Sequence, residues 1–221
     1  MREIVGCVFQ SIDGVMQAPG GPSEDPTGGF QFGGWQFAFP DEVADAVIGQ
    51  QCAAPFDMLL GRRTYDIFSS YWPYVEGEPA ALGQLFTESD KYVLTHRDEP
   101  LEWANSHRLA DLDAVAALRQ GDGPELRIWG SSTLYPLLLG AGLLDRIILL
   151  TYPLVLGEGK RLFGSGTPPR TFVARSQSAG HGGVAIATLE PAGEVQVGAS
   201  PAAPPNSREA ERQNKIAQGT W

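Results

Sequence analysis

Two short apolar stretches of the sequence end in glycine and lead straight into a helical pattern, and this arrangement constrains the fold most. Residues 57–60 precede Gly61 and a helical spacing of apolar residues at 62–71. Residues 126–129 precede Gly130 in the same way. Strand–glycine–helix units of this kind alternate through most of the chain. They predict a largely parallel sheet with helices on both faces, an α/β fold.

The remaining elements follow from similar local patterns. Further strands are expected at 3–9, 91–95 and 145–151, and further helices after Pro40, at 112–120 and at 131–140. Late strands without intervening helices are expected at 171–176, 183–189 and 195–197. The late strands indicate antiparallel additions at one edge of the sheet.

The domain organisation is expected to be simple. Residues 1–198 are predicted to form one domain, because no linker or internal repeat interrupts them. Residues 199–221 are rich in Pro, Ala and polar residues, and we expect a flexible tail there with a short helix at 207–218.

Charge and composition exclude several classes of function. The 221 residues carry a formal net charge of −10, which argues against nucleic acid as the main partner. No apolar run is long enough for a membrane span, and no leader pattern is present, so a cytoplasmic protein with a small-molecule substrate is expected. Cys7 and Cys52 fit no disulfide framework. His96, His107 and His181 form no convincing metal cluster, so no metal is expected.

The strand–glycine–helix junctions are candidate phosphate sites. In Gly61-Arg62-Arg63-Thr64, a sharp turn, a helix N-terminus, two guanidinium groups and a hydroxyl could together hold phosphate. The alternative is an ordinary helix start with two solvated arginines. Gly130-Ser131-Ser132-Thr133 repeats the pattern, with a plain serine cap as its alternative.

A third strand end carries Thr95-His96-Arg97, whose side chains could meet an anionic or adenine-bearing group. Neither the glycine-rich dinucleotide fingerprint after the first strand nor a Walker lysine motif is present. A bound nucleotide would therefore use a different arrangement.

Several motifs together resemble the dihydrofolate reductase-like superfamily, and most closely the reductase domain of the bacterial riboflavin-biosynthesis deaminase-reductase and its stand-alone relatives. The resemblance covers about residues 2–198. The motifs that carry it are Ser11-Ile12-Asp13-Gly14, Leu60-Gly61-Arg62-Arg63-Thr64, Val93-Leu94-Thr95, Trp129-Gly130-Ser131-Ser132 and Pro153-Leu154-Val155-Leu156-Gly157-Glu158-Gly159-Lys160-Arg161-Leu162-Phe163.

The resemblance implies a three-layer fold around a mostly parallel eight-stranded sheet, with NADPH as cofactor. It implies that the segment from Gly61 contacts the cofactor phosphates and that the segment from Gly130 follows the pyrophosphate and nicotinamide. It also implies that Thr95-His96-Arg97 lies near the adenosine, and that Ser11 and Asp13 border the nicotinamide and substrate. A homodimer is a further expectation from the resemblance.

Three departures from the family pattern bear on the activity. Residues 17–34 form a longer, more glycine-rich loop than in true dihydrofolate reductases, and the glycine-rich turn of those enzymes here holds one glycine, Gly130. No zinc deaminase signature is present. The resemblance therefore implies a free-standing reductase.

The resemblance implies that a carboxylate on the first helix helps to protonate the substrate, as in folate reductases. Asp41, Glu42 and Asp45 are the candidates. The expected apolar face, which includes Ala46, is centred nearer Glu42, whereas counting back from Gly61 favours Asp45. All three also fit as first-turn acids that stabilise the helix dipole.

Two further residues have open roles. Thr151 could bond to the acid or the substrate, as in the resembling family, or could simply suit a strand. Trp35 could cover an aromatic substrate or cap the core.

The predicted function is NADPH-dependent hydride transfer to a C=N or C=O bond of a small heterocyclic or sugar-linked substrate. A narrower alternative is 5-amino-6-(5-phosphoribosylamino)uracil reductase of the riboflavin pathway, with Lys160 and Arg161 binding the extra phosphate. Dihydrofolate reduction and a non-catalytic nucleotide-binding protein on the same fold are further alternatives.

Overall fold

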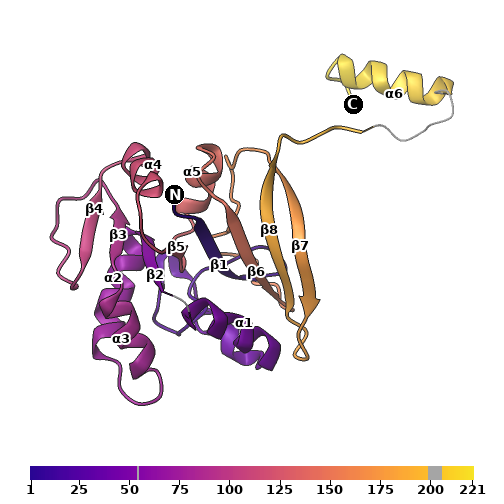
Figure 1. The fold of residues 1–221 in the computed structure, drawn as a ribbon. Coiled ribbons are helices and arrows are strands. Elements are labelled where there is room, and N and C mark those ends of the chain that lie inside the picture. The colour runs from indigo at the N-terminus through magenta and orange to yellow at the C-terminus, as the bar shows by residue number, and fades with distance from the viewer. Residues whose placement is uncertain (54, 199–205) are drawn as a thin grey trace.

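A computed structural model describes residues 1–53, 55–198 and 206–221, and its centre is one eight-stranded sheet (Figure 1). The strand order is β4-β3-β2-β5-β1-β6-β8-β7. All pairings from β4 to β6 are parallel, and β8 and β7 are added antiparallel at one edge. The strands are β1 (Ile4–Ser11), β2 (Phe56–Gly61), β3 (Lys91–Leu94), β4 (Ser106–Leu109), β5 (Glu125–Ile128), β6 (Arg146–Tyr152), β7 (Thr171–Ala179) and β8 (Ala185–Gly193).

Helices cover both faces of the sheet and give three layers. The helices are α1 (Glu42–Ala53), α2 (Arg62–Tyr71), α3 (Ala80–Glu88), α4 (Leu112–Gln120), α5 (Leu134–Gly140) and α6 (Ser207–Ala217). In Figure 1, α4 and α5 lie above the sheet, and α1, α2 and α3 lie below it. The expected α/β fold, mostly parallel with an antiparallel edge, is confirmed.

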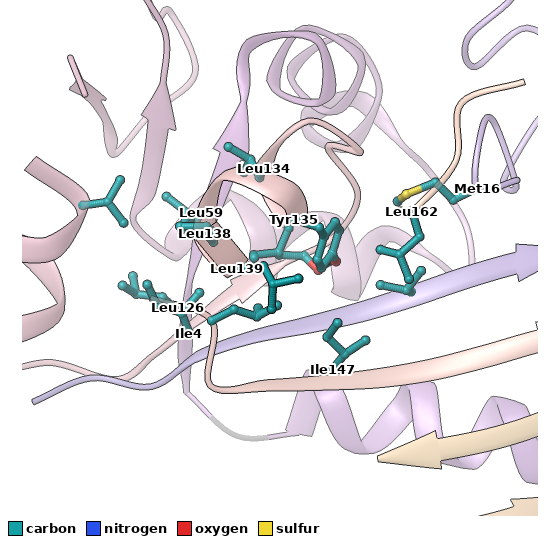
Figure 2. Close-up of a cluster of buried hydrophobic side chains, with 14 residues drawn as sticks. Ile4, Met16, Leu59, Leu126, Leu134, Tyr135, Leu138, Leu139, Ile147 and Leu162 are labelled. Atoms are coloured by element: carbon teal, nitrogen blue, oxygen red, sulfur yellow. Dashed lines mark hydrogen bonds between the residues drawn. The ribbon is translucent and has the colours of Figure 1, made fainter. Parts of the chain in front are cut away.

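Apolar side chains alternate along the strands and build the layers. Ile4 and Val8 of β1 face α4 and α5, whereas Val5 and Cys7 face α1. Figure 2 shows Tyr135 among the leucines of α5, gathered against the central strands. This core holds the carboxyl ends of β1, β2, β5 and β6 in fixed register.

A buried ion pair ties the N-terminus to the sheet. The Arg2 guanidinium bonds to the carboxylate of Asp57 and donates from Nε to the carbonyl of Pro124 at 2.7 Å. The other carboxylate oxygen of Asp57 accepts the Asp90 N–H at 3.3 Å. The Arg2 and Asp57 side chains are only 3% and 10% exposed, so each charge depends on the other for its compensation.

Several predicted elements need correction. The strand expected at 195–197 does not form, because the antiparallel edge is completed by β7 and β8 alone. Neither the helix α3 nor the strand β4 is predicted from the sequence. The helix expected at 131–140 begins only at Leu134, after a turn. The helices predicted at 62–71 and 207–218 correspond to α2 and α6, while residues 199–205 of the predicted flexible tail lie outside the described part. Among the described helices, none combines the length and the apolar character that a membrane crossing requires.

Candidate active site

Five adjacent parallel strands end at one edge of the sheet, and the predicted site residues follow their ends. In spatial order these strands are β3, β2, β5, β1 and β6. Their ends lead into Thr95, Gly61, Gly130, Ser11 and Tyr152. The edge where parallel strands finish is the usual ligand-binding side of such sheets.

The two glycine junctions are joined directly to each other. The N–H of Gly61 donates to Ser131 Oγ at 2.8 Å, and Ser131 Oγ donates to Thr64 Oγ1 at 2.7 Å. Gly130 and Ser131 have φ values of 119° and 66°. The left-handed conformation is costly for a serine, so this turn is held by its contacts. The junction therefore fixes the start of α2 against the turn that precedes α5.

The space at the junction is tight for a side chain at either glycine. A Cβ on Gly61 would lie 3.1 Å from Ser131 Oγ, and one on Gly130 would lie 3.3 Å from a methyl carbon of Thr64. Ser132 is half-buried and Thr133 is exposed in the same turn. The backbone of both turns is thus close together and open to an approaching group.

Arg62 and Arg63 point to different partners. Arg62 donates to the Asp66 carboxylate at 2.7 Å and to the carbonyl of Glu99 at 3.0 Å, and so braces α2 against the segment after β3. Arg63 instead reaches the 17–34 loop, where its Nη1 bonds to Thr27 Oγ1 at 2.6 Å. Of these two arginines, Arg63 is the one that keeps its guanidinium at the loop that borders the site.

The third predicted contact segment continues from β3. Thr95 is buried, and its hydroxyl accepts the N–H of Arg97 at 3.1 Å, which shapes the turn. His96 and Arg97 are exposed. Their side chains can turn toward a group bound over the sheet edge.

The 17–34 loop is bonded to Lys160, in the segment 153–163 that follows β6. Gln17 is buried, donates to the carbonyls of Asp25 and Thr27 at 2.9 Å each, and accepts the Lys160 N–H at 3.0 Å. Lys160 Nζ bonds to the Asp25 carboxylate. Burial acts to raise the pKa of Asp25, but hydrogen bonds from Lys160 and Thr27 hold it below the usual value.

The predicted substrate residues Asp13 and Arg161 pair with each other. Asp13 accepts the Ser11 hydroxyl at 2.6 Å, the N–H of Gly157 at 2.9 Å and Arg161 Nη2 at 3.3 Å. The Ser11 hydrogen bond is the main reason that the pKa of Asp13 falls to about 2. Ser11, Asp13 and Arg161 therefore fix the loop after β6.

An aromatic cluster lies between the sheet and α1. Trp35 is buried, donates from Nε1 to the Gln17 carbonyl at 2.8 Å, and packs edge-on against Tyr152 at 5.4 Å. Phe39 and Phe9 also contact the Tyr152 ring, with centroids at 6.3 and 6.5 Å. Of the two roles considered for Trp35, the structure gives it the one in the core.

Asp41 is the cap of α1. Its carboxylate accepts the N–H groups of Val43 and Ala44 at 3.1 Å each, and that of Gly182 in the β7–β8 turn at 2.7 Å. Burial acts to raise the pKa of Asp41, but these donors hold it below the usual value. Asp41 thus stays ionised and occupied, which leaves Glu42 and Asp45 as the candidate acids.

Replacing Gly180 with alanine is expected to destabilise the protein by about 1–3 kcal/mol, because the new Cβ would overlap the Asp41 carboxylate and displace the cap. Chemical denaturation measures the loss. Gly49→Ala on α1 is the control, since no atom lies near its Cβ position and the helix should gain about 0.5–1 kcal/mol. An equal gain for Gly180→Ala would show that the cap tolerates the displacement.

The sequence predicts Glu42 at the border of the buried face of the helix, but the structure leaves its side chain exposed. Ala44 is the buried residue of α1, with Val43, Val47 and Ile48 packed beside it, while Ala46 is exposed. The cap at Asp41 fixes this rotation of the helix, so Glu42 points to solvent.

Asp45 acts on the aromatic cluster through its charge. It is exposed, and its charge adds to burial in raising the pKa of the Tyr152 phenol above the usual value. The contact expected between Thr151 and the acid is not observed, because alternation along β6 turns Thr151 to the opposite face. There its hydroxyl accepts from Gln10 Nε2 at 3.2 Å.

Sequence reasoning missed Asp25, Thr27 and Tyr152. Tyr152 could have been found from the sequence. It follows Thr151 in the expected strand, so alternation places its aromatic ring on the opposite face, toward α1. Asp25 and Thr27 lie in a glycine-rich loop without periodicity, and only the folded chain brings them to Lys160. Within the described residues, His, Cys, Asp and Glu form no group of three or more suited to a metal ion.

Known structures share this fold at low sequence identity. A putative riboflavin biosynthesis protein from Shewanella sp. PV-4 aligns with a TM-score of 0.61 at 17% identity, over 86% of this chain and 99% of its own. A pyrimidine reductase-like protein from Corynebacterium diphtheriae gives 0.54 at 14% identity, over 86% and 92%. Dihydrofolate reductase from Enterococcus faecalis, complexed with NADP(H), gives 0.52 at 15% identity, over 86% and 96%. The fold is dihydrofolate reductase-like.

Sequence comparison agrees with the fold. The uncharacterized protein YyaP of Bacillus subtilis (strain 168) is 29% identical over 112 residues, which are 48% of this chain and 58% of YyaP. The match thus spans little more than half the length of that relative. The family model of the RibD C-terminal domain matches residues 2–184, nearly the whole sheet with both glycine junctions and α1. The chain belongs to the RibD C-terminal domain family.

Proposed function

We propose that this protein is an NADPH-dependent reductase that transfers a hydride to a C=N or C=O bond of a small heterocyclic or sugar-linked substrate. One observation carries the proposal: the bond network of Gly61, Ser131 and Thr64 unites two strand–glycine–helix junctions at the ligand-binding edge. The dihydrofolate reductase with the same fold binds NADP(H), and a second structural relative is described as pyrimidine reductase-like. Both agree with a nicotinamide cofactor here.

The residues present fit such a cofactor. The N-terminus of α2 begins directly at Arg62 and offers unpaired N–H groups and the positive end of the helix dipole to a phosphate. The close packing at Gly61 and Gly130 leaves the backbone within reach of a pyrophosphate. His96 and Arg97, both exposed, are the candidate contacts of the adenosine and its phosphate.

When bound, the reduced nicotinamide supplies the hydride. We assign to Asp45 the supply of the proton, because it is exposed to solvent and its charge acts on Tyr152 at the end of β6. Burial raises the pKa of Tyr152 well above its usual value, so the phenol stays protonated. It therefore offers a hydrogen-bond donor and does not compete for the proton.

Titration of the purified chain with NADPH and NADH tests the proposal. Saturable binding with NADPH preferred is expected, followed by tryptophan fluorescence and by a rise in thermal stability. No binding of either nucleotide at millimolar concentration would refute it and leave the non-catalytic alternative.

Ser131→Ala is expected to weaken NADPH binding about tenfold, because the bonds of Ser131 Oγ to Gly61 and Thr64 are lost while the left-handed backbone remains. The same titration measures it. Ser178→Ala on the exposed strand β7 is the matched control and should bind like the wild type. Equal NADPH affinities of the wild type, Ser131→Ala and Ser178→Ala would show that the junction does not contribute to NADPH binding.

A phosphorylated substrate is the second candidate feature, as in 5-amino-6-(5-phosphoribosylamino)uracil reduction. The cations Arg63 and Lys160 that meet at Thr27 favour it. A screen of this compound and dihydrofolate for NADPH oxidation distinguishes the alternatives, and turnover of dihydrofolate alone would count against a phosphate requirement.

A further inference from the structure

Three segments far apart in the sequence meet at the hydroxyl of Thr27. Thr27 Oγ1 accepts from Arg63 Nη1 of α2 at 2.6 Å and from Lys160 Nζ at 2.9 Å. It donates to Asp25 Oδ1 at 2.5 Å. Two cations therefore converge on one hydroxyl and one carboxylate, all held by the 17–34 loop.

The two cations reach the surface, whereas the carboxylate lies beneath them. The Asp25 side chain is 10% exposed, compared with 51% for Arg63 and 34% for Lys160. Asp25 bonds directly to Lys160 but lies 3.5 Å from Arg63, so its hold on the guanidinium is weak. The Asp25 carboxylate thus offers one negative charge to these two cations.

An open pocket adjoins this group. Its volume is about 280 Å³, and Thr27, Gly28 and Phe30 line one wall while Glu158, Gly159 and Lys160 line another. Gly28 and Gly29 both have positive φ, of 73° and 78°, so the segment after Thr27 follows a turn of glycine conformations. An incoming ligand thus meets Lys160 and Thr27 from the open side.

We propose that Arg63, Lys160 and Thr27 form a phosphoryl-binding site in which the Asp25 carboxylate takes the place of the ligand in the free protein. A phosphoryl group has three acceptor oxygens and up to two negative charges, so it can serve both cations and the hydroxyl at once. Asp25 has two oxygens and one charge. Binding of the phosphoryl group therefore releases the Asp25 carboxylate to solvent, together with its bonds to Lys160 and to the Thr27 N–H, while the Thr27 hydroxyl stays at the site.

Asp25 consequently sets the affinity of the site. A ligand that binds only when Asp25 has moved away can bind only the fraction of protein in which the site is open. Its apparent dissociation constant is the intrinsic constant divided by that fraction, so its apparent affinity is lower. An asparagine amide at this position would hydrogen-bond in the same place without the charge, so the Asp25→Asn protein would compete less. Phosphate is expected to bind that variant about tenfold more tightly than the wild type.

Titration of the full chain with inorganic phosphate, at constant ionic strength, tests this. Asp25→Asn is compared with Glu190→Gln, which removes the same charge at an exposed pair with Arg175 on the antiparallel edge. Tighter binding by Asp25→Asn alone is expected, and loss of binding by Lys160→Met but not by Lys215→Met. Equal phosphate affinity in the Asp25→Asn and Glu190→Gln proteins would overturn the proposal.

Hydrogen exchange on the wild type gives a second measure that does not depend on a variant folding. Phosphate should speed exchange of the Thr27 amide, which donates to Asp25 Oδ1 at 3.3 Å, and chloride at the same ionic strength should not. Slower exchange of this amide with phosphate would refute the release of Asp25.

The natural owner of the phosphoryl group is either the cofactor or the substrate, and on that point alone the inference rests on the proposed function. If saturating phosphate weakens NADPH binding, the group belongs to the cofactor; if the two bind independently, it belongs to a phosphorylated substrate. NADPH binding without the Asp25→Asn effect would refute this inference and leave the reductase proposal intact. Phosphate binding without NADPH binding would do the reverse.

Discussion

Replacing Asp57 with alanine is expected to lower the free energy of unfolding by about 3–5 kcal/mol, since the change leaves the Arg2 guanidinium buried without a counter-charge. The Asp90 N–H also loses its acceptor. Urea denaturation followed by circular dichroism measures the loss. A shift of the midpoint at unchanged slope would show that stability has fallen while the surface exposed on unfolding has stayed the same.

An exposed ion pair provides the control for this prediction. Arg175 and Glu190 pair across β7 and β8 at 2.7 Å with side chains 60% and 33% exposed, so Glu190→Ala should cost no more than about 1 kcal/mol. Combining Arg2→Met with Asp57→Ala should recover much of the loss, because no unpaired charge then remains. A loss for Asp57→Ala as small as that for Glu190→Ala would mean that the Pro124 carbonyl alone satisfies Arg2.

Asp45→Asn is expected to lower the turnover of the reductase reaction by about 10²–10⁴-fold, the usual contribution of a general acid. The amide keeps the size of the side chain but cannot deliver a proton. The measurement is the steady-state rate of NADPH oxidation with whichever compound the substrate screen identifies. Affinity for NADPH should be unchanged, since Asp45 belongs to α1 and not to the glycine junctions.

Glu42→Gln is the matched control, one turn earlier on the same helix and with the same change of charge. It should keep nearly full turnover, because the charge of Asp45 acts on Tyr152 and that of Glu42 does not. The opposite result, with Glu42→Gln inactive and Asp45→Asn active, would assign the proton to Glu42. Full activity of both variants would place the proton source outside α1.

The sequence predicted those parts of the fold that depend on local signals. The bounds of α2 follow from Gly61 before it and Pro73 after it, and both act within a few residues. In contrast, β4 is a short strand with two exposed residues, and its pairing with β3 is what stabilises it. The apolar pattern of α3 is interrupted by Gly83, which packs against the carbonyl of Trp72. Local periodicity carries no trace of such contacts.

The candidate site divides in the same way. The junctions at Gly61 and Gly130 could be predicted, because parallel strands bring their ends to one edge whatever the details. The rotation of α1 could not, since it depends on the bond between Asp41 and Gly182, two residues separated by most of the chain. The register counted back from Gly61 favoured Asp45, while the helical pattern around Ala46 favoured Glu42. The cap at Asp41 determines which face of α1 is buried.

The bond from Gly182 to Asp41 matters for exchanging parts between relatives. It joins the beginning of α1 to the turn of the terminal hairpin, and Gly180 leaves the room that the carboxylate needs. In a chimera that takes β7 and β8 from another protein, the foreign hairpin turn would therefore influence the orientation of the recipient's α1. Recombination breakpoints placed after β8 should preserve the activity of the recipient. A breakpoint between β6 and the hairpin turn instead separates Asp41 from Gly180 and Gly182, and should disturb α1 unless both parents carry all three residues.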